Sequence, residues 1–349
     1  MVEINFNIHF ISNVSQGKHI GSRNQALGLA EALQKQNPKA KIHEYDLHDL
    51  AELKQSLKSS GKQILITVGN DGAAALKEMP KKMGYISILL GHEIPRGIEK
   101  IEDAVDILAI PEHITDYKEI PGIKCIRTHG VSHAMTKEKA ASALEKWRNK
   151  FPGNRWPPAI IVMLGGVVDG VDYDPREAFL LGRYAVKKAK EVGAMILATS
   201  SPRAEKTAIE LLTSALEQED CPAAFFPCGG AFDESPFQAM IGLAAENPKS
   251  RIIVSGDSVS MPCEAASVVA PHQLIICSMS NENEQNRNFV EWMHREGRAK
   301  IIESSPKSHK ILIRPLVENP LPAPLDAASQ IAEAVYGFIN APVPSPRLQ

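Results

Sequence analysis

Short runs of β-branched and other apolar residues alternate with segments of helical periodicity along nearly the whole chain. In the first half, the apolar runs predict strands at 4–11, 42–45, 64–68, 86–90, 107–110 and 125–127. The segments between them predict helices, which include 24–36, 50–59, 73–82 and 137–150. Alternation of this kind is typical of βαβ units and therefore of a mainly parallel sheet.

A segment rich in proline and glycine, FPGNRWPP at 151–158, interrupts this pattern and predicts a linker. After it the alternation resumes, with strands expected at 160–164, 195–199, 223–226, 252–255, 274–277 and 300–302. The accompanying helices are expected at 176–191, 204–217, 237–245 and 286–296. Residues 315–326 are proline-rich, and 327–339 predicts one last amphipathic helix.

The chain is therefore expected to be an α/β protein with two doubly wound, Rossmann-like domains facing a cleft. The first domain is predicted at 1–150, the linker at 151–158 and the second domain at 159–314, with the proline-rich segment and returning helix at 315–349. Ligands of such sheets bind outside the carboxyl ends of the strands, so the loops that follow the strands are the candidate site.

Composition and net charge argue against some classes of function. The chain has 349 residues, enough for two cores, and a net charge of −2 with 5% aromatic residues, which argues against nucleic acid as a partner. Five scattered cysteines form no CxxC pair and no metal-ligand spacing, as expected for a cytoplasmic protein with reduced thiols. The sequence shows no signal peptide and no apolar stretch of about 18 residues, which predicts no transmembrane segment and leaves peripheral membrane contact open.

The stretch RIIVSGDSVSMPCEA at 251–265 carries the most specific chemistry. Its β-branched run stops at Ser255-Gly256-Asp257, and the hydroxyls of Ser258 and Ser260 precede a helix start. A helix start offers free N–H groups to a phosphate, and Glu264, one turn on, is placed to accept ribose hydroxyls. The alternative interpretation is a capping serine with a carboxylate that complements the helix dipole.

Other strands of the second half also end in glycines or hydroxyls. Gly165 and Gly166 would let backbone N–H groups approach a ligand, and Gly229 opens a loop that could hold a nucleobase. Ser200, Ser201 and Arg203 follow the next strand, and hydroxyls with a guanidinium suit a diphosphate. Each of these loops alone can also be a tight turn or a cap, but together they place many donors at one sheet edge.

The first half has one comparable loop, SQGKHIGSRNQALGLAEAL at 15–33. Gly17, Lys18 and Gly21 are expected in a basic loop that contacts an acceptor or a phosphate, with Ser22 or Asn24 capping the next helix. His19 is the first candidate for a catalytic base, because histidine titrates near neutrality, and His113 and His133 are the next. The alternatives are an ordinary βα turn and structural histidines.

Several stretches together resemble the elongated-mitochondria (mitochondrial fission ELM) family of GT-B glycosyltransferases. They are GSRNQALGLAEAL, VDILAIPEH, THGVSHAMT, MLGG, TSSPR, SPFQAMIGLA and SGDSVSMPCEA. The resemblance implies an N-terminal acceptor domain, a C-terminal donor domain and a final helix that packs back. It further implies a donor site at Gly165, Gly166, Ser201, Arg203, Ser258, Ser260, Met261 and Glu264, and an acceptor side at Gly21, Asn24, Gln25, His113 and His133.

The expected function is transfer of a sugar from a nucleotide-sugar donor to an unknown acceptor, of cell-envelope or lipid-linked type by analogy, with no cofactor and no essential metal. A second hypothesis is a non-catalytic binding or scaffold protein on the same fold. It is favoured by Ser22 and Pro202, which stand where the family has a histidine and an arginine. A third is a nucleotide-sugar epimerase or hydrolase.

Overall fold

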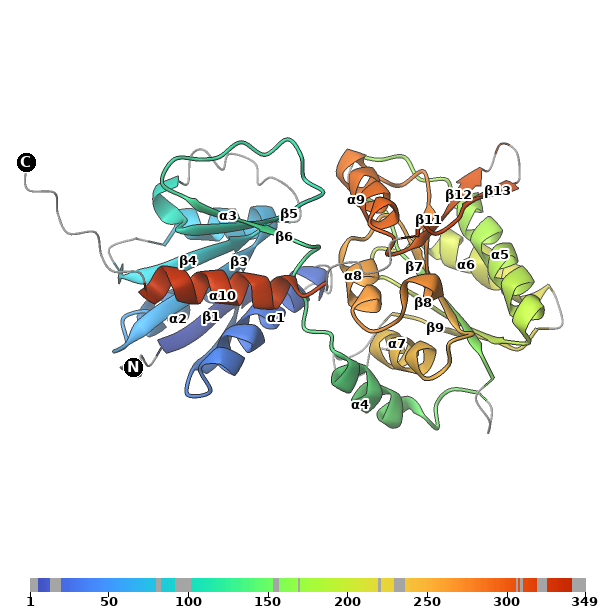
Figure 1. Ribbon diagram of the computed structural model, residues 1–349, viewed down its shortest axis with the longest axis horizontal. Helices are drawn as coiled ribbons and strands as arrows, with labels where there is room; N and C mark the ends of the chain where they lie inside the picture. The colour runs from blue at the N-terminus through green and yellow to red at the C-terminus, as the bar shows by residue number, and fades with distance from the viewer. Residues whose placement is uncertain are drawn as a thin grey trace, which may run out of the picture. The chain divides into compact units, whose positions relative to one another are not determined.

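The computed structural model describes residues 6–12, 20–79, 83–91, 102–152, 157–168, 170–218, 221–228, 236–305, 307, 310–318 and 325–340. It consists of two compact units (Figure 1). Unit 1 is formed by Met1–Ala134 and Asp326–Gln349, and unit 2 by Met135–Leu325. The C-terminal helix thus belongs to the same unit as the N-terminal strand, as expected for a helix that packs back.

Unit 1 is a parallel sheet with helices on both faces. Its strands are β1 (Phe6–Ser12), β2 (Lys41–Asp46), β3 (Lys62–Val68), β4 (Tyr85–Leu90), β5 (Ile107–Pro111) and β6 (Lys124–Thr128), in the order β2-β1-β3-β4-β5-β6. Its described helices are α1 (Ile20–Gln36), α2 (Leu50–Ser56), α3 (Gly69–Lys77) and α10 (Ala327–Asn340). Because side chains alternate along a strand, Ile64 and Ile66 of β3 pack under α1 and α10, and Leu65 packs in the core on the other face.

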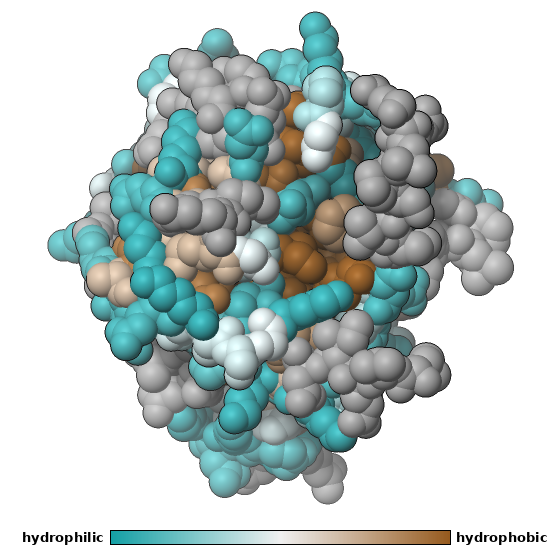
Figure 2. Space-filling model, turned by 90° about the vertical axis from the view of Figure 1, so that its left-hand side faces the viewer, coloured by the Kyte–Doolittle hydropathy of each residue, from teal (hydrophilic) through white to brown (hydrophobic). Residues whose placement is uncertain are grey.

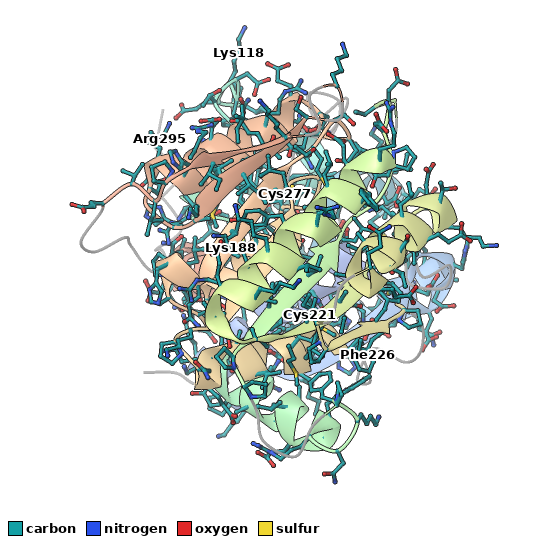
Figure 3. All side chains as sticks on the ribbon, turned by 90° about the vertical axis from the view of Figure 1, so that its right-hand side faces the viewer. Lys118, Lys188, Cys221, Phe226, Cys277 and Arg295 are labelled. Carbon is teal, nitrogen blue, oxygen red and sulfur yellow. The ribbon has the colours of Figure 1, made fainter. Side chains whose placement is uncertain are left out.

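Unit 2 has a seven-stranded sheet in the order β13-β12-β11-β10-β7-β8-β9. The strands are β7 (Ala159–Leu164), β8 (Met195–Ser200), β9 (Ala223–Phe226), β10 (Arg251–Ser255), β11 (Leu274–Ser278), β12 (Lys300–Ser305) and β13 (Lys310–Arg314). The helices are α4 (Lys137–Trp147), α5 (Arg176–Val192), α6 (Lys206–Glu217), α7 (Pro236–Glu246), α8 (Ser260–Ala266) and α9 (Glu284–Arg295). Figure 3 shows α5, which carries Lys188, beside α6 on one face of this sheet.

The strand order of unit 2 defines where a ligand can bind. From β7 the chain moves outward to β8 and β9, then returns to the other side of β7 for β10, β11 and β12. The order therefore reverses between β7 and β10. In doubly wound sheets the loops separate at such a point and leave a crevice at the carboxyl ends of the two strands.

The predicted α/β class is confirmed, but two helix starts are wrong. Helix α1 begins at Ile20, so Gly21 lies inside it rather than in a loop, and Asn24 is buried in the helix instead of capping it. Likewise α3 begins at Gly69 rather than at 73. The first turn contains Gly21 and Ser22 in α1, and Gly69 and Asn70 in α3. These residues have a lower helix propensity than alanine, and tertiary packing overrides that preference.

The antiparallel strand β13 was not expected from the sequence. It pairs with β12 and forms an edge of the sheet, where Leu312 is 58% and Ile313 47% exposed. Charged residues at both ends, Lys310 and Arg314, are a common protection of such an edge against further pairing.

The boundary between the units also differs from the predicted linker at 151–158. The chain passes from unit 1 to unit 2 between Ala134 and Met135, so α4 belongs to unit 2. Helix α4 packs tightly on α7, and a Cβ atom on Gly242 would lie 2.3 Å from the carbonyl oxygen of Ala140. Sequence periodicity predicts the helix but does not show which sheet it covers.

Peripheral membrane contact, which the sequence leaves open, would require exposed apolar side chains, and unit 1 has some. Figure 2 shows a face of unit 1 on which apolar side chains gather among hydrophilic ones. Phe338 in α10 is 37% exposed, and the Lys124 ammonium lies 5.7 Å from the centre of its ring. Among the described residues, no helix has the length and apolar character needed to pass through a bilayer.

Candidate functional site

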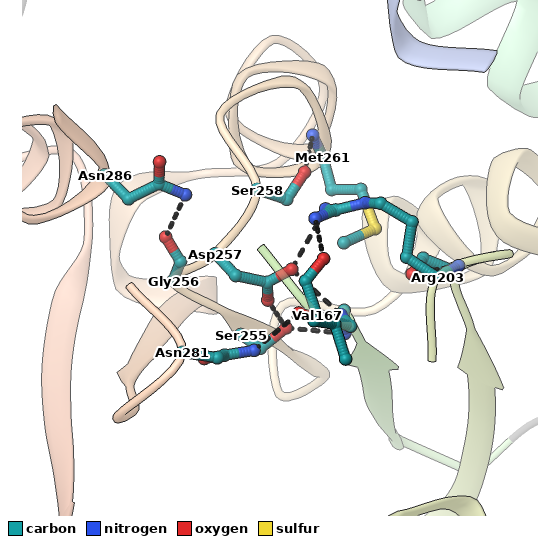
Figure 4. A network of polar contacts seen from close by, with 12 residues as sticks. Val167, Arg203, Ser255, Gly256, Asp257, Ser258, Met261, Asn281 and Asn286 are labelled. Carbon is teal, nitrogen blue, oxygen red and sulfur yellow. Dashed lines mark hydrogen bonds and ion pairs between the residues drawn. The ribbon is translucent and has the colours of Figure 1, made fainter. Parts of the chain in front are cut away.

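The loops that follow β7 and β10 meet at the point where the strand order of unit 2 reverses (Figure 4). The side chain of Asp257 is at the centre of this contact. Its Oδ2 accepts a hydrogen bond from the Gly166 N–H at 2.9 Å, and its Oδ1 accepts one from the Ser255 hydroxyl at 2.6 Å. The Ser255 oxygen in turn accepts from the Gly165 N–H at 2.6 Å. One buried carboxylate therefore fixes both loops.

Arg203, from the loop after β8, joins the same group. It donates from Nη2 to Asp257 Oδ2 at 3.0 Å and from Nη1 to the Val167 carbonyl oxygen at 2.9 Å. The Arg203 side chain is 35% exposed, whereas that of Asp257 is completely buried. Burial raises the pKa of Asp257, and the Arg203 guanidinium and the hydroxyl of Ser255 oppose this shift. The positively charged Arg203 therefore lies partly at the surface, whereas the negatively charged Asp257 lies in the interior.

Ser201, in the same loop after β8, helps to fix the backbone of Arg203. The Ser201 N–H donates to the Leu164 carbonyl oxygen at 2.7 Å, and the Ser201 hydroxyl oxygen accepts from the Arg203 N–H at 3.2 Å. Ser200 is buried at the end of β8. The predicted donor residues Gly165, Gly166, Ser200, Ser201 and Arg203 are therefore brought together at one edge.

The structure gives Gly165 and Gly166 a different role from the predicted close approach of a ligand. A Cβ atom on Gly165 would lie 1.8 Å from Asp257 Oδ1, and one on Gly166 would lie 2.1 Å from the carbonyl carbon of Arg203. Both glycines are thus required by contacts within the protein itself. Their binding of a donor stays a prediction.

The residues predicted around α8 lie on the neighbouring loop. Ser258 accepts a hydrogen bond from the Met261 N–H at 3.3 Å, as in the capping alternative, and Ser260 is the first residue of the helix. Figure 4 shows Ser258 and Met261 on the side of the network where the Arg203 guanidinium lies. Glu264 is only 3% exposed, and its contact with a ribose stays a prediction.

The predicted acceptor-side residues lie in unit 1. Gly21, Asn24 and Gln25 belong to α1, and the carbonyl oxygen of Gln25 accepts from the Ser132 hydroxyl at 2.8 Å. His113, after β5, is 3% exposed, and His133, after β6, is 8% exposed. Both imidazoles are buried, so the catalytic role of these two histidines stays a prediction. Four further predicted residues lie outside the described residues, namely Gly17, Lys18, His19 and Gly229.

Three residues of this site were not predicted as functional. The sequence pattern places Asp257 in a turn, although an acidic residue directly after a buried strand also indicates a functional position. Asn281 donates from Nδ2 to the Gly166 carbonyl oxygen at 2.8 Å. Its buried Oδ1 has no hydrogen-bond partner among the described residues. Glu282 follows it in the chain, and no sequence pattern distinguishes either residue.

Glu282 is the second buried carboxyl group of this edge. It accepts from the Met279 N–H at 2.9 Å and from the Ser278 hydroxyl at 3.0 Å. A Cβ atom on Gly256 would lie 2.0 Å from its Oε1, so it packs directly under the Asp257 turn. Burial raises the pKa of Glu282 to about 7, and the charge of Asp257 adds to this shift.

The raised pKa of Glu282 predicts a pH dependence of stability. Because the folded state holds the proton more tightly than the unfolded state, with a pKa of about 7 against 4.5, stability falls as the pH rises from 4.5 to 7. In Glu282→Gln the amide cannot ionise, so the melting temperature of unit 2 is expected to change less between pH 5 and pH 8. Calorimetry at both pH values measures this.

The control for this measurement is Glu210→Gln on α6, where the carboxylate is 62% exposed. It should follow the wild-type pH dependence. A Glu282→Gln variant that loses stability between pH 5 and pH 8 as steeply as the wild type would contradict the assignment.

The described residues contain no group of three or more His, Cys, Asp or Glu side chains suited to hold a metal ion. The described free cysteines are Cys125, Cys221, Cys228, Cys263 and Cys277. Burial raises the pKa of the Cys277 thiol well above its usual value, and Cys277 lies on β11 inside the core of unit 2 (Figure 3).

The chain is similar in fold to several solved structures. The UDP-GlcNAc 2-epimerase from Methanocaldococcus jannaschii is similar over 95% of this chain and 99% of its own, with 11% identity and a TM-score of 0.57. MnaA from S. aureus, in a co-structure with UDP, is less similar: it covers 97% of this chain and 88% of its own, with 12% identity and a TM-score of 0.48. MurG from Acinetobacter baumannii covers 87% of this chain and 88% of its own, with 10% identity and a TM-score of 0.43. The fold is of the GT-B type, with two doubly wound α/β domains.

Comparison of sequences concerns the family. No curated protein sequence matches the chain significantly. The sequence profile described as mitochondrial fission ELM1 matches residues 20–337, which span both units and the returning helix. The chain belongs to the mitochondrial fission ELM1 family.

Proposed function

We propose that the protein is a glycosyltransferase that moves a sugar from a nucleotide-sugar donor to an acceptor hydroxyl, and that unit 2 binds the donor. The observation that carries this proposal is the fixed position of Arg203 at the point where the strand order reverses. Ligand phosphates of doubly wound sheets bind at that point.

Arg203 is suited to a diphosphate because it is partly exposed and already held in place. Asp257 and Val167 orient the guanidinium plane, so little further conformational entropy is lost on binding. An arginine has five N–H donors, and the two hydrogen bonds described use only two of the terminal N–H groups. The remaining donors can form the charge-assisted hydrogen bonds that phosphate oxygens favour.

Further residues would complete the donor site. The hydroxyls of Ser201 and Ser258 lie on the loops next to Arg203 and would serve as additional donors to the phosphates. Glu264 would accept hydroxyls of the ribose, and the segment at Gly229, which lies outside the described residues, would hold the base. The most similar fold reported above is that of an enzyme named for a UDP-sugar, so UDP and its sugars are the first ligands to test.

The proposal predicts that Arg203→Lys weakens the binding of UDP or GDP. Lysine retains the charge next to Asp257 but loses the planar fork of donors. Loss of one or two hydrogen bonds to a charged group, worth about 1.5–3 kcal/mol, corresponds to a dissociation constant roughly 10- to 100-fold higher. Isothermal titration calorimetry with each nucleotide measures the change.

The matched control is Arg295→Lys on α9, whose side chain is 72% exposed and, among the described residues, forms an ion pair with its neighbour Glu296. It should bind the nucleotide like the wild type. Absence of binding of UDP, GDP and CMP by the wild-type protein would overturn the donor site. Binding without any turnover of the corresponding sugars would favour a scaffold, and product analysis would distinguish sugar transfer from epimerisation or hydrolysis.

A further inference from the structure

Exposed apolar side chains gather at β13, the antiparallel strand at one edge of the sheet of unit 2 (Figure 1). Among the described residues, five large apolar side chains are exposed, and three of them, Leu312, Ile313 and Val317, lie in this strand or just after it. Leu312 and Ile313 are on opposite faces, because side chains alternate along a strand. Pro315 lacks an N–H group and follows the last residue of the strand. The edge is therefore a five-residue strand with an exposed apolar side chain on each face.

At the C-terminal end of β13, carboxylates outnumber cations. Arg314 donates to Glu291 of α9 with both terminal nitrogens, and its Nη1 lies 3.5 Å from Glu303 of β12. His294 adds no positive charge to this group, because its Nδ1 accepts from Arg314 Nη2 at 3.2 Å and its Nε2 donates to the Pro315 carbonyl oxygen at 2.8 Å. Both carboxylates are partly exposed, Glu291 to 57% and Glu303 to 41%. Two carboxylates thus share one guanidinium, which leaves an excess of one negative charge.

At the N-terminal end of β13 the charge is reversed. Lys310 is exposed and has no ion-pair partner among the described residues. It shares a face of the strand with Leu312 and Arg314, since residues two apart point to the same side. Charged ends of this kind prevent pairing with most strands. A second copy of β13 that runs antiparallel has the same charges in the opposite order and is therefore complementary to the first.

We propose that the protein forms a two-fold symmetric dimer in which β13 pairs antiparallel with β13 of a second copy. In the register centred on Leu312, this residue lies opposite itself and Ile311 lies opposite Ile313. Lys310 lies opposite Arg314, so its ammonium meets the excess negative charge around that guanidinium. Each of these contacts occurs twice, except the one on the axis. Cross-strand pairs of apolar and of oppositely charged side chains are the contacts that stabilise antiparallel strands.

The sequence of the strand selects this register among the symmetric ones. A two-fold axis at Ile311 would place Lys310 opposite the apolar Leu312. An axis at Ile313 would place Ile311 opposite Pro315, which has no N–H group to donate. Only the axis at Leu312 pairs all five residues of β13 with one another.

Sedimentation velocity of the full-length protein at low to high micromolar concentrations tests the dimer. The wild type is expected to change from monomer to dimer as its concentration rises. Leu312→Glu places two carboxylates opposite each other on the axis and should stay monomeric. Lys310→Glu replaces two symmetric attractions by repulsions and should raise the dissociation constant roughly 2- to 30-fold. Because both side chains are exposed, the melting temperature of unit 2 should stay the same.

The matched control for the charge reversal is Lys206→Glu on α6, where the side chain is 91% exposed. It makes the same change of charge in the same unit, on a helix that follows β8 rather than β12. It should dimerise like the wild type.

Cross-linking tests the register. Opposite residues of antiparallel strands have Cα atoms about 4.5–5.5 Å apart, a distance that a disulfide spans. Leu312→Cys should therefore form a covalent dimer with oxidised glutathione, which takes up the two electrons and two protons of the paired thiols. Ile313→Cys is the matched control, because this residue lies opposite Ile311 instead of itself. It retains the same five native cysteines and should stay largely uncross-linked.

Each outcome decides the proposal. A wild type that stays monomeric at every concentration would overturn it, and so would a dimer that persists in Leu312→Glu. Cross-linking of Ile313→Cys as fast as that of Leu312→Cys would overturn the register and with it the symmetric pairing. A monomeric wild type that binds phosphatidylglycerol vesicles, with binding lost in Leu312→Glu, would assign the exposed side chains to a membrane surface instead of a second copy.

Discussion

The Asp257→Ala substitution is expected to lower the free energy of unfolding of unit 2 by about 1–3 kcal/mol for each buried donor that loses its acceptor. The Gly166 N–H and the Ser255 hydroxyl lose their acceptor at the same time. Arg203 loses the group that orients it, so binding of UDP or GDP should be lost as well. The calorimetric transition of unit 2 and nucleotide titration measure the two effects.

Two variants control for this result. Asp257→Asn keeps the shape and one carbonyl acceptor, so it should fall between the wild type and Asp257→Ala. Glu210→Ala removes a carboxylate of α6 that is 62% exposed, and it should leave the transition of unit 2 nearly unchanged. If Asp257→Ala melts like Glu210→Ala, the carboxylate does not join the loops as described.

The sequence predicts those parts of the fold that depend on local periodicity. The predicted strand at 223–226 coincides with β9, and the other expected strands agree with the observed ones to within a few residues. The pattern also identified the loops after β7, β8 and β10 as one edge of a sheet, because parallel strands of one sheet end on the same side. Gly165, Arg203 and Ser258 could therefore be placed in one site.

The partners within that site could not be predicted, because they depend on strand order. Gly166 meets Asp257 only because β10 pairs with β7, a contact between residues far apart in the chain. Asn281 joins them through a loop with no distinctive pattern.

Helix α4 packs on α7 through a close contact at Gly242, which Gly242→Ala is expected to disrupt. The new Cβ atom would lie 2.3 Å from the Ala140 carbonyl oxygen and 3.2 Å from the Leu144 Cβ atom. Because a backbone carbonyl of α4 cannot rotate away, α4 and α7 must separate. Overpacking of this kind costs roughly 1–3 kcal/mol. The Arg148–Glu246 ion pair and the contact of Trp147 with Phe226 should also loosen.

Gly337→Ala in α10 is the matched control, since it makes the same change in a helix where nothing lies within 4 Å of the new atom. It should stabilise unit 1 by about 0.5–1 kcal/mol, because alanine is the better helix former. If Gly242→Ala lowers the melting temperature of unit 2 and Gly337→Ala raises that of unit 1, Gly242 is required for packing. Hydrogen exchange of the α4 amides then tests the boundary itself: Gly242→Ala should expose α4 if this helix belongs to unit 2, whereas unchanged protection would mean that α4 is held by other contacts.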